Sequence, residues 1–150
     1  MDFLKFRMID RVITLNKTQR SILCKTQLPE SSFIFDAHFP GFPILPGVFM
    51  IETIAQAAGL LFIGLEGFKK MPILFGVEHT RFRHLVPPAT ALTVSVQLVH
   101  SGSGYIVCEG DISNQGSRVA NAEVRLKLID TPIETEALQR QACIAVQLPL

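Results

Sequence analysis

The sequence predicts an α+β domain in which a curved antiparallel sheet wraps around one long central helix. Two observations lead to this prediction. An almost wholly apolar segment covers residues 47–65, and stretches on both sides of it alternate apolar and polar residues between turn-forming positions. A sheet with one apolar face needs a cover, and this segment is the only predicted element apolar enough to supply it. A chain of 150 residues, 48% of them hydrophobic, is long enough to bury such a core.

The first half of the chain is expected to form two strands, a linker and the helix. In order, these are strands over residues 8–15 and 21–26, an extended linker over 31–36 and the helix over 47–65. Gly64 and Gly67 are expected to end the helix. Lys69 and Lys70 follow on its C-terminal side, where positive charge suits the helix dipole.

The second half of the chain is expected to form an antiparallel meander. Its expected strands cover residues 73–83, 92–98, 105–113 and 119–129, and the first of these is long enough to be bulged. Pro87-Pro88 breaks the first strand, because proline cannot donate to a strand ladder. We therefore predict one domain over residues 1–130 and a C-terminal tail over 131–150, with a short helix over 134–142.

Composition narrows the function classes. A formal net charge of +1 gives no general electrostatic argument for nucleic-acid binding, and the short basic cluster of Arg81 and Arg83 is the kind usually found on a solvated surface. Cys24, Cys108 and Cys143 lack metal-type spacing, and their odd number argues against a disulfide framework. We expect Cys108 to pack as a small hydrophobic residue. The first residues do not have the pattern of a signal peptide, so a cytoplasmic location is expected.

The apolar segment also raises the question of a membrane span. Residues 48–65 contain no Lys or Arg, which is compatible with a spanning helix by length. A span would bury Glu52 in the apolar slab at a cost of a few kcal/mol. Gln56, Gly59 and Gly64 also argue against a span. We predict a helix buried inside protein, with the membrane span as the alternative.

A proline-rich loop, HFPGFPILPG over residues 38–47, leads directly into this helix. Its three prolines restrict their own backbone and that of the preceding residues, so the loop is expected to be stiff. His38 opens the loop, and an imidazole that titrates near neutrality suits a general base, although a lone loop histidine more often faces solvent. His79 and His84 offer a weak alternative as metal ligands. They lie five residues apart without a Cys or Asp to complete a set, so no metal is predicted.

The start of the helix carries two further candidates. No Ser, Thr, Asp or Asn stands at the capping position, so the amides of Gly47 and Val48 could bind an oxygen that becomes negative, or could simply be capped by water. Glu52 lies on the second turn, and Gln56 shares its face one turn later. A carboxyl in apolar surroundings is expected to be partly protonated and able to donate a proton. The alternative is a structural carboxyl held by Gln56.

Together, these features resemble the FabZ-type β-hydroxyacyl-(acyl carrier protein) dehydratases, a branch of the hotdog-fold superfamily. The resemblance rests on three segments: His38-Phe39-Pro40-Gly41, Pro43-Ile44-Leu45-Pro46-Gly47-Val48, and Glu52 followed by Ala55-Gln56. The 14-residue interval from His38 to Glu52 is the family's spacing. Phe75-Gly76-Val77, Arg81-Phe82-Arg83 and Val86-Pro87 look like the family's next strand, and the resemblance covers roughly residues 8–129.

The resemblance implies a fold, an assembly and a reaction. Two protomers would pair edge to edge as a homodimer, with a trimer of dimers as the alternative assembly, and His38 of one would face Glu52 of the other. Neutral His38 would remove the proton beside the thioester carbonyl, the amide of Gly47 or Val48 would hold the enolate oxygen, and protonated Glu52, oriented by Gln56, would help the hydroxyl leave as water. No cofactor, metal, nucleic acid or membrane span is implied.

The resemblance also implies the partners of the reaction. The substrate would be carried by phosphopantetheine on an acyl carrier protein, which Arg81 and Arg83 could guide. Its acyl chain would lie in an apolar tunnel, for which Phe49, Phe62 and Phe75 are candidates, although simple core packing explains them at least as well. Because the sequence departs from the family motif at several positions, a specialised lipid or polyketide-like pathway is an alternative to fatty-acid synthesis. The alternatives to a dehydratase are a hotdog acyl thioesterase that uses Glu52 alone, and a non-catalytic acyl-binding partner.

Overall fold

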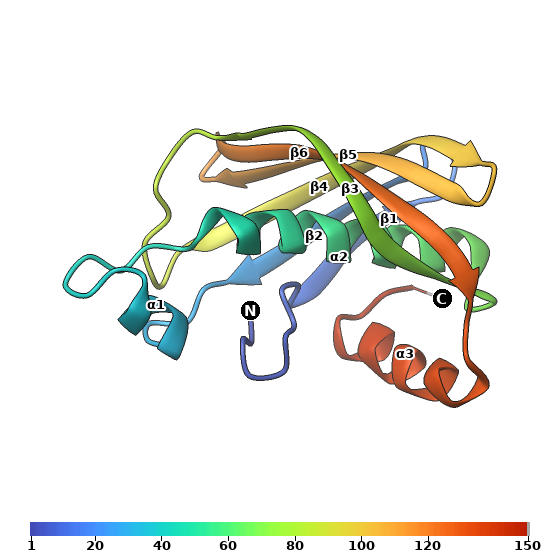
Figure 1. The fold of residues 1–150 in the computed structure, drawn as a ribbon, viewed down its shortest axis with the longest axis horizontal. Helices are drawn as coiled ribbons and strands as arrows, with labels where there is room; N and C mark the ends of the chain where they lie inside the picture. The colour runs from blue at the N-terminus through green and yellow to red at the C-terminus, as the bar shows by residue number, and fades with distance from the viewer. Residues whose placement is uncertain (150) are drawn as a thin grey trace.

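The computed structural model describes residues 1–149, apart from the side chains of residues 133 and 134, and it confirms the hotdog arrangement of a sheet around a helix (Figure 1). Six strands form one sheet in the spatial order β1-β2-β4-β5-β6-β3, and every neighbouring pair is antiparallel. The strands are β1 (Arg11–Asn16), β2 (Ser21–Gln27), β3 (Lys70–Phe82), β4 (Ala91–Gly102), β5 (Tyr105–Asn114) and β6 (Ser117–Asp130). The helices are α1 (Phe33–Ala37), α2 (Gly47–Glu66) and α3 (Ile133–Ala145).

Helix α2 is the predicted central helix and lies along one face of the sheet (Figure 1). It ends at Gly67, whose φ of 79° favours glycine and whose N–H donates to the Ile63 carbonyl at 2.8 Å. Gly64 does not end the helix as predicted. The helix continues through Gly64, where Leu15 of β1 packs so closely that a Cβ would come within 2.6 Å of the leucine side chain. Lys70 lies outside the last helical turn and begins β3.

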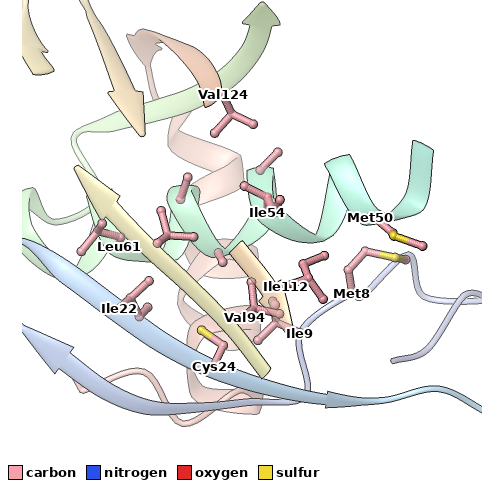
Figure 2. Close-up of a cluster of buried hydrophobic side chains, with 14 of the residues drawn as sticks. Met8, Ile9, Ile22, Cys24, Met50, Ile54, Leu61, Val94, Ile112 and Val124 are labelled. Carbon is pink, nitrogen blue, oxygen red and sulfur yellow. The ribbon is translucent and has the colours of Figure 1, made fainter. Parts of the chain in front are cut away.

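The core lies between α2 and the sheet. Figure 2 shows Met50, Ile54 and Leu61 of α2 among side chains from the strands and the N-terminal segment, including Ile22, Cys24, Val94, Ile112 and Val124. Burying each large aliphatic side chain of this kind stabilises the fold by about 1.5–3 kcal/mol. By length and hydropathy alone, α2 could span a membrane, but the buried core helices of soluble proteins meet the same criteria. In this fold, 56% of the most apolar 18-residue window of α2 is buried.

Two segments differ from the sequence-based expectation. The linker expected to be extended over residues 31–36 instead contains the short helix α1, because Ser32 caps it by accepting a hydrogen bond from the Phe35 amide at 3.3 Å. Phe35 then anchors the helix in the core, where its ring meets Phe3 edge-on at 5.9 Å. The helix expected over residues 134–142 is present and longer, as α3.

The two edges of the sheet differ in how they are covered. β1 is six residues long, and its Val12 amide donates to the Val146 carbonyl just after α3 at 2.7 Å. β3 is thirteen residues long and, within the described residues, pairs only with β6. Two irregularities interrupt this ladder, in agreement with the predicted bulge. Most of its residues are exposed, including Ile73, Phe75 and Val77. An edge that is long, apolar and unpaired invites pairing with another strand.

Candidate active site

The proline-rich loop that holds His38 is closed by backbone hydrogen bonds at both ends. The His38 amide donates to the Ile34 carbonyl at the end of α1, and its carbonyl accepts from the Ile44 amide, both at 2.9 Å. The Leu45 amide then donates to the Val86 carbonyl at 2.8 Å. The peptide bond between His38 and Phe39 is cis, and their rings stack with centroids 4.0 Å apart. Because the backbone hydrogen bonds hold both ends of the loop, the half-buried imidazole is carried on a fixed backbone.

The N-terminus of α2 has free donors beside a close aromatic contact. Pro46 occupies the cap position, no side chain caps the first N–H groups, and the first turn carries no acidic residue. The Phe82 ring lies so near Gly47 that a Cβ there would be 2.8 Å from its edge. Val48 is exposed. Glycine at position 47 thus allows this approach, and the uncapped amides can donate to an oxygen that gains negative charge.

Glu52 is held by a network that reaches from α2 to the N-terminal segment. The Gln56 Nε2 atom donates to Glu52 Oε1 and to the Phe6 carbonyl, each at 2.9 Å. The Gln56 Oε1 atom accepts from the Met8 amide at 2.9 Å. Because this oxygen accepts a backbone N–H, the orientation of the carboxamide is fixed and its NH₂ group must face the carboxyl. The sequence pattern indicated the Glu52–Gln56 pair but not its backbone partners.

A cavity of about 290 Å³ opens beside this carboxyl and follows α2 toward its C-terminal end. Small and aliphatic side chains form much of its wall, among them Ala55, Gly59, Leu60 and Ile63 of α2. β3 contributes further apolar wall, and the side of α3 closes it. Such a cavity can hold an apolar chain whose polar end lies near Glu52.

The structure does not bring all the predicted residues to this cavity. His38 does not line this cavity within the described chain. The three predicted tunnel aromatics also lie elsewhere. Phe49 packs edge-on against Phe3 at 5.2 Å, Phe62 is buried in the core, and the half-exposed Phe75 meets Tyr105 at 6.1 Å.

The two predicted carrier-contact residues flank the aromatic contact at the helix start. Arg81 and Arg83 are exposed on either side of Phe82, and the Arg83 guanidinium donates to the Asn121 side chain. Among the described residues, no group of three or more His, Cys, Asp or Glu side chains could hold a metal ion. His79 is exposed in the irregular part of β3.

Comparison with known proteins gives a family match over most of the chain. Residues 3–123 match the model of the FabA-like domain. A protein of Clostridium acetobutylicum named 3-hydroxyacyl-[acyl-carrier-protein] dehydratase FabZ is 31% identical over 123 residues, which cover 81% of this chain and 86% of that protein. The protein of the same name from Coxiella burnetii is 34% identical over 79% of this chain and 86% of its own length.

Solved structures show the same fold at lower identity. A chain of the dehydratase heterocomplex ApeI:P from Xenorhabdus doucetiae superposes with a TM-score of 0.63 at 19% identity, covering 90% of this chain and 89% of that one. A hypothetical thioesterase from Streptococcus pneumoniae, solved with coenzyme A, gives a TM-score of 0.62 at 15% identity over 81% of this chain and 89% of its own. Dehydratases and thioesterases therefore share this fold, and the side chains must separate the two activities.

Proposed function

The chain belongs to the FabA-like family, and on that basis we propose that it is a 3-hydroxyacyl-(acyl carrier protein) dehydratase, a lyase that converts a β-hydroxyacyl thioester into a trans-2-enoyl thioester and water. The observation that carries this proposal is the Glu52–Gln56 pair. It lies on the central helix, fixed at 2.9 Å, at the mouth of an apolar cavity. A carboxyl held in this way can give a proton to a leaving hydroxyl beside a bound acyl chain.

The active site is completed by a second copy of the chain. His38 does not line the Glu52 cavity of its own protomer, while the edge of β3 is unpaired in the described structure and exposes apolar side chains such as Val77 and Phe82. Pairing β3 with the β3 strand of a second protomer would extend the sheet across the dimer and bury these side chains. The His38 loop of one protomer then faces Glu52 of its partner.

The reaction follows from the roles of four groups. His38 takes the proton from the carbon beside the thioester carbonyl, and the electron pair forms the carbon–carbon double bond. The amides of Gly47 and Val48 donate to the carbonyl oxygen as it gains negative charge, a contribution of about 2–4 kcal/mol for one good donor. Glu52 gives its proton to the β-hydroxyl, which leaves as water when its carbon–oxygen bond breaks.

The catalytic groups then return to their starting states. After one turnover His38 carries an extra proton and Glu52 lacks one, so a single proton must pass between them, through water, before the next cycle. Hydration of the enoyl thioester is the same path in reverse. Gln56 keeps Glu52 in position throughout, because its carboxamide is tied to the backbone of residues 6 and 8.

The carrier protein approaches at the same end of the molecule. Arg81 and Arg83 are exposed beside Phe82, which covers Gly47, so they lie near the proposed oxyanion donors. Two guanidinium groups there favour an acidic carrier protein whose phosphopantetheine arm delivers the thioester. We place the reaction in the cytoplasm, in fatty-acid synthesis or a related lipid pathway.

Mixing two inactive variants tests both the chemistry and the shared site. His38→Ala and Glu52→Gln are each expected to lower hydration of a crotonyl thioester by about a hundredfold or more. In a two-subunit site, a mixed dimer of these variants contains one site with both groups intact. Random remixing after unfolding and refolding should therefore recover roughly a quarter of wild-type activity, since half of the dimers are mixed and each has one of two sites restored.

The outcomes separate the competing interpretations. Absence of recovery, with refolded dimers verified by size, would contradict the shared site and place both groups in one protomer. Release of free thiol from a saturated acyl thioester, without hydration of the enoyl thioester, would identify a thioesterase instead. Unchanged hydration in Glu52→Gln would remove the acid role of this carboxyl.

A further inference from the structure

The C-terminal helix α3 closes the cavity that begins at Glu52. Gln139, Ala142 and Cys143 of α3 line it together with the face of α2 that runs from Glu52 to Ile63. Ile63 lies eleven positions after Glu52, about 16 Å along the axis at the rise of an α-helix. Resting on the proposed function, we propose that α3 is the end wall of the acyl-binding pocket and that Cys143 sets the longest acyl chain the enzyme accepts.

The position of α3 places it at the end of the pocket opposite Glu52. Figure 1 shows α3 beneath the C-terminal half of α2, whereas Glu52 lies on the second turn of that helix. The Arg140 guanidinium lies 4.3 Å from the centre of the Phe68 ring, just beyond the end of α2. A chain that enters beside Glu52 and follows α2 therefore meets the wall that Gln139, Ala142 and Cys143 of α3 form.

This wall is fixed. Cys143, Val146 and Leu148 are all buried, with exposed fractions of 1%, 3% and 6%. The segment after α3 is also tied to the sheet, because the Val12 amide donates to the Val146 carbonyl at 2.7 Å. A wall held by buried side chains and a strand hydrogen bond cannot move aside at low cost, so it can exclude a chain that is too long.

The wall of the pocket is mostly apolar, and Gln139 is the polar side chain that α3 contributes to it. Ile63, Met71 and Leu126 line it beside Cys143, whose thiol is buried and small. A volume of about 290 Å³ is at the lower limit of ligand pockets, which favours short to medium acyl chains over long ones. Since the family match ends at residue 123, the end wall is built by a segment outside that match.

Two kinds of substitution should move the length limit by different amounts. Gly59 lines the middle of the pocket, and a Cβ there would meet only Pro72, at 3.5 Å, so Gly59→Leu should place a side chain across the path of the acyl chain. Cys143→Phe should fill the end of the pocket, and Cys143→Ala should lengthen it. Leu138→Ala is the matched control, because Leu138 is on the exposed side of α3, 66% exposed, and does not line the pocket.

The experiment measures kcat/KM for hydration of trans-2-enoyl thioesters of increasing even carbon number on acyl carrier protein. In the wild type, kcat/KM should rise by about fourfold for each methylene that is buried, then fall tenfold or more beyond the limiting length. The limit should be shortest in Gly59→Leu, longer in Cys143→Phe, longer again in the wild type and Leu138→Ala, and longest in Cys143→Ala. Circular dichroism verifies that each variant is folded.

An unchanged length limit in the Cys143 variants would overturn the proposal, even if Gly59→Leu shortens the limit, and so would a shift in Leu138→Ala as large as that in the Cys143 variants. If Cys143→Phe fails to fold, Cys143→Ala and Gly59→Leu still decide the order of the limits. Failure of the proposed function has a different signature, because the wild type would then hydrate no thioester of any length.

Discussion

Gln56 donates to the Glu52 carboxyl at 2.9 Å while its own oxygen accepts the Met8 amide at 2.9 Å, so the candidate acid is joined to the N-terminal segment through one carboxamide. This relationship assigns Gln56 a positioning role. A residue that acts in this way should affect the rate of the chemical step more than substrate binding.

Replacing Gln56 tests this role. Gln56→Leu removes the donor to Glu52 and leaves the Met8 amide without its acceptor, so we expect a loss of about 1–3 kcal/mol of unfolding free energy. We also expect kcat to fall about tenfold or more with little change in KM. Urea denaturation and steady-state hydration kinetics measure the two effects. Gln56→Glu keeps an acceptor for the Met8 amide but also lacks the donor to Glu52, so it should lose kcat like Gln56→Leu while losing less stability. A kcat near that of the wild type in either variant would contradict the positioning role.

Alanine substitutions at two glycines, one on β5 facing α2 and one within α2, are expected to have opposite effects on stability. Gly110 on β5 is buried, and a Cβ there would overlap the side chain of Ile54, which is itself fully buried. Gly110→Ala should therefore destabilise the protein by about 1–3 kcal/mol, because a packed core cannot take the extra atom. In the double variant with Ile54→Ala, which removes the Cγ2 atom that the new Cβ would overlap, the combined loss should be smaller than the sum of the two single losses. A simple sum of the two single effects, measured by urea denaturation, would show that the two residues do not compete for space.

Gly59→Ala provides the matched opposite case. The nearest atom to a Cβ at Gly59 is Pro72 Cγ, at an ordinary 3.5 Å, so the methyl group fits. Alanine is the better helix former, and the substitution should raise the free energy of unfolding by up to about 1 kcal/mol. A destabilised Gly59→Ala would show that the cavity wall is tighter at this point than its contacts indicate.

The buried thiols predict a loss of stability in alkali. Burial raises the pKa of Cys24 to about 12 and that of Cys108 to about 12, from a reference of 9.0. Above pH 9 the unfolded chain loses these protons while the folded chain keeps them, so unfolding releases protons and rising pH favours it. The stabilisation is complete below pH 9 and declines as the pH approaches 12, by about 1.4 kcal/mol per pH unit for each thiol.

Cys24→Ala isolates one of these contributions. Its unfolding free energy is expected to be lower than that of the wild type at neutral pH, because a buried side chain is truncated. Its decline between pH 9 and 11 should nevertheless be shallower by the contribution of one thiol. Parallel pH dependences for the wild type and Cys24→Ala in urea denaturation would contradict burial of a protonated thiol at this position.

The strands, the central helix and the helix-borne pair could be predicted because their signals are local. Period-two alternation marks β4 to β6, and the spacing of Glu52 and Gln56 places them on one helix face. Helix α1 gave no such signal, since five residues are too few for a helical period to appear. The link from Gln56 to the Met8 amide joins positions 48 residues apart through a backbone group, and a backbone group leaves no mark in the sequence.

The aromatic residues predicted for an acyl tunnel do not line the cavity beside Glu52 within the described chain. Phe49, Phe62 and Phe75 are large and apolar, which suits a tunnel wall and a core equally well. The cavity lies beside small residues of α2 such as Ala55 and Gly59, because small side chains leave space next to a helix unfilled. The small residues of α2 are visible in the sequence, but only the packed structure shows which of them leave space unfilled.

The exposed edge of β3 gives the last prediction. Val77 pairs with Val124, a buried residue of β6, and so lies on the inner face of the sheet, yet Val77 is 37% exposed because the described structure has nothing beyond this edge. An inward-pointing charge on an edge strand is a device that prevents pairing with another sheet. Val77→Lys should therefore yield a folded monomer and lower hydration activity by about a hundredfold or more, because no partner supplies His38.

Ile13→Lys on β1 is the matched control for this substitution. Ile13 is 41% exposed on the opposite edge, where the Val12 amide is already bonded to the Val146 carbonyl. The same charge there should leave both the dimer and the activity unchanged. Light scattering during gel filtration gives the mass of each variant, and circular dichroism verifies the fold. A dimeric Val77→Lys with wild-type activity would place the subunit contact on another surface, and an active monomer would show that one chain contains the whole site.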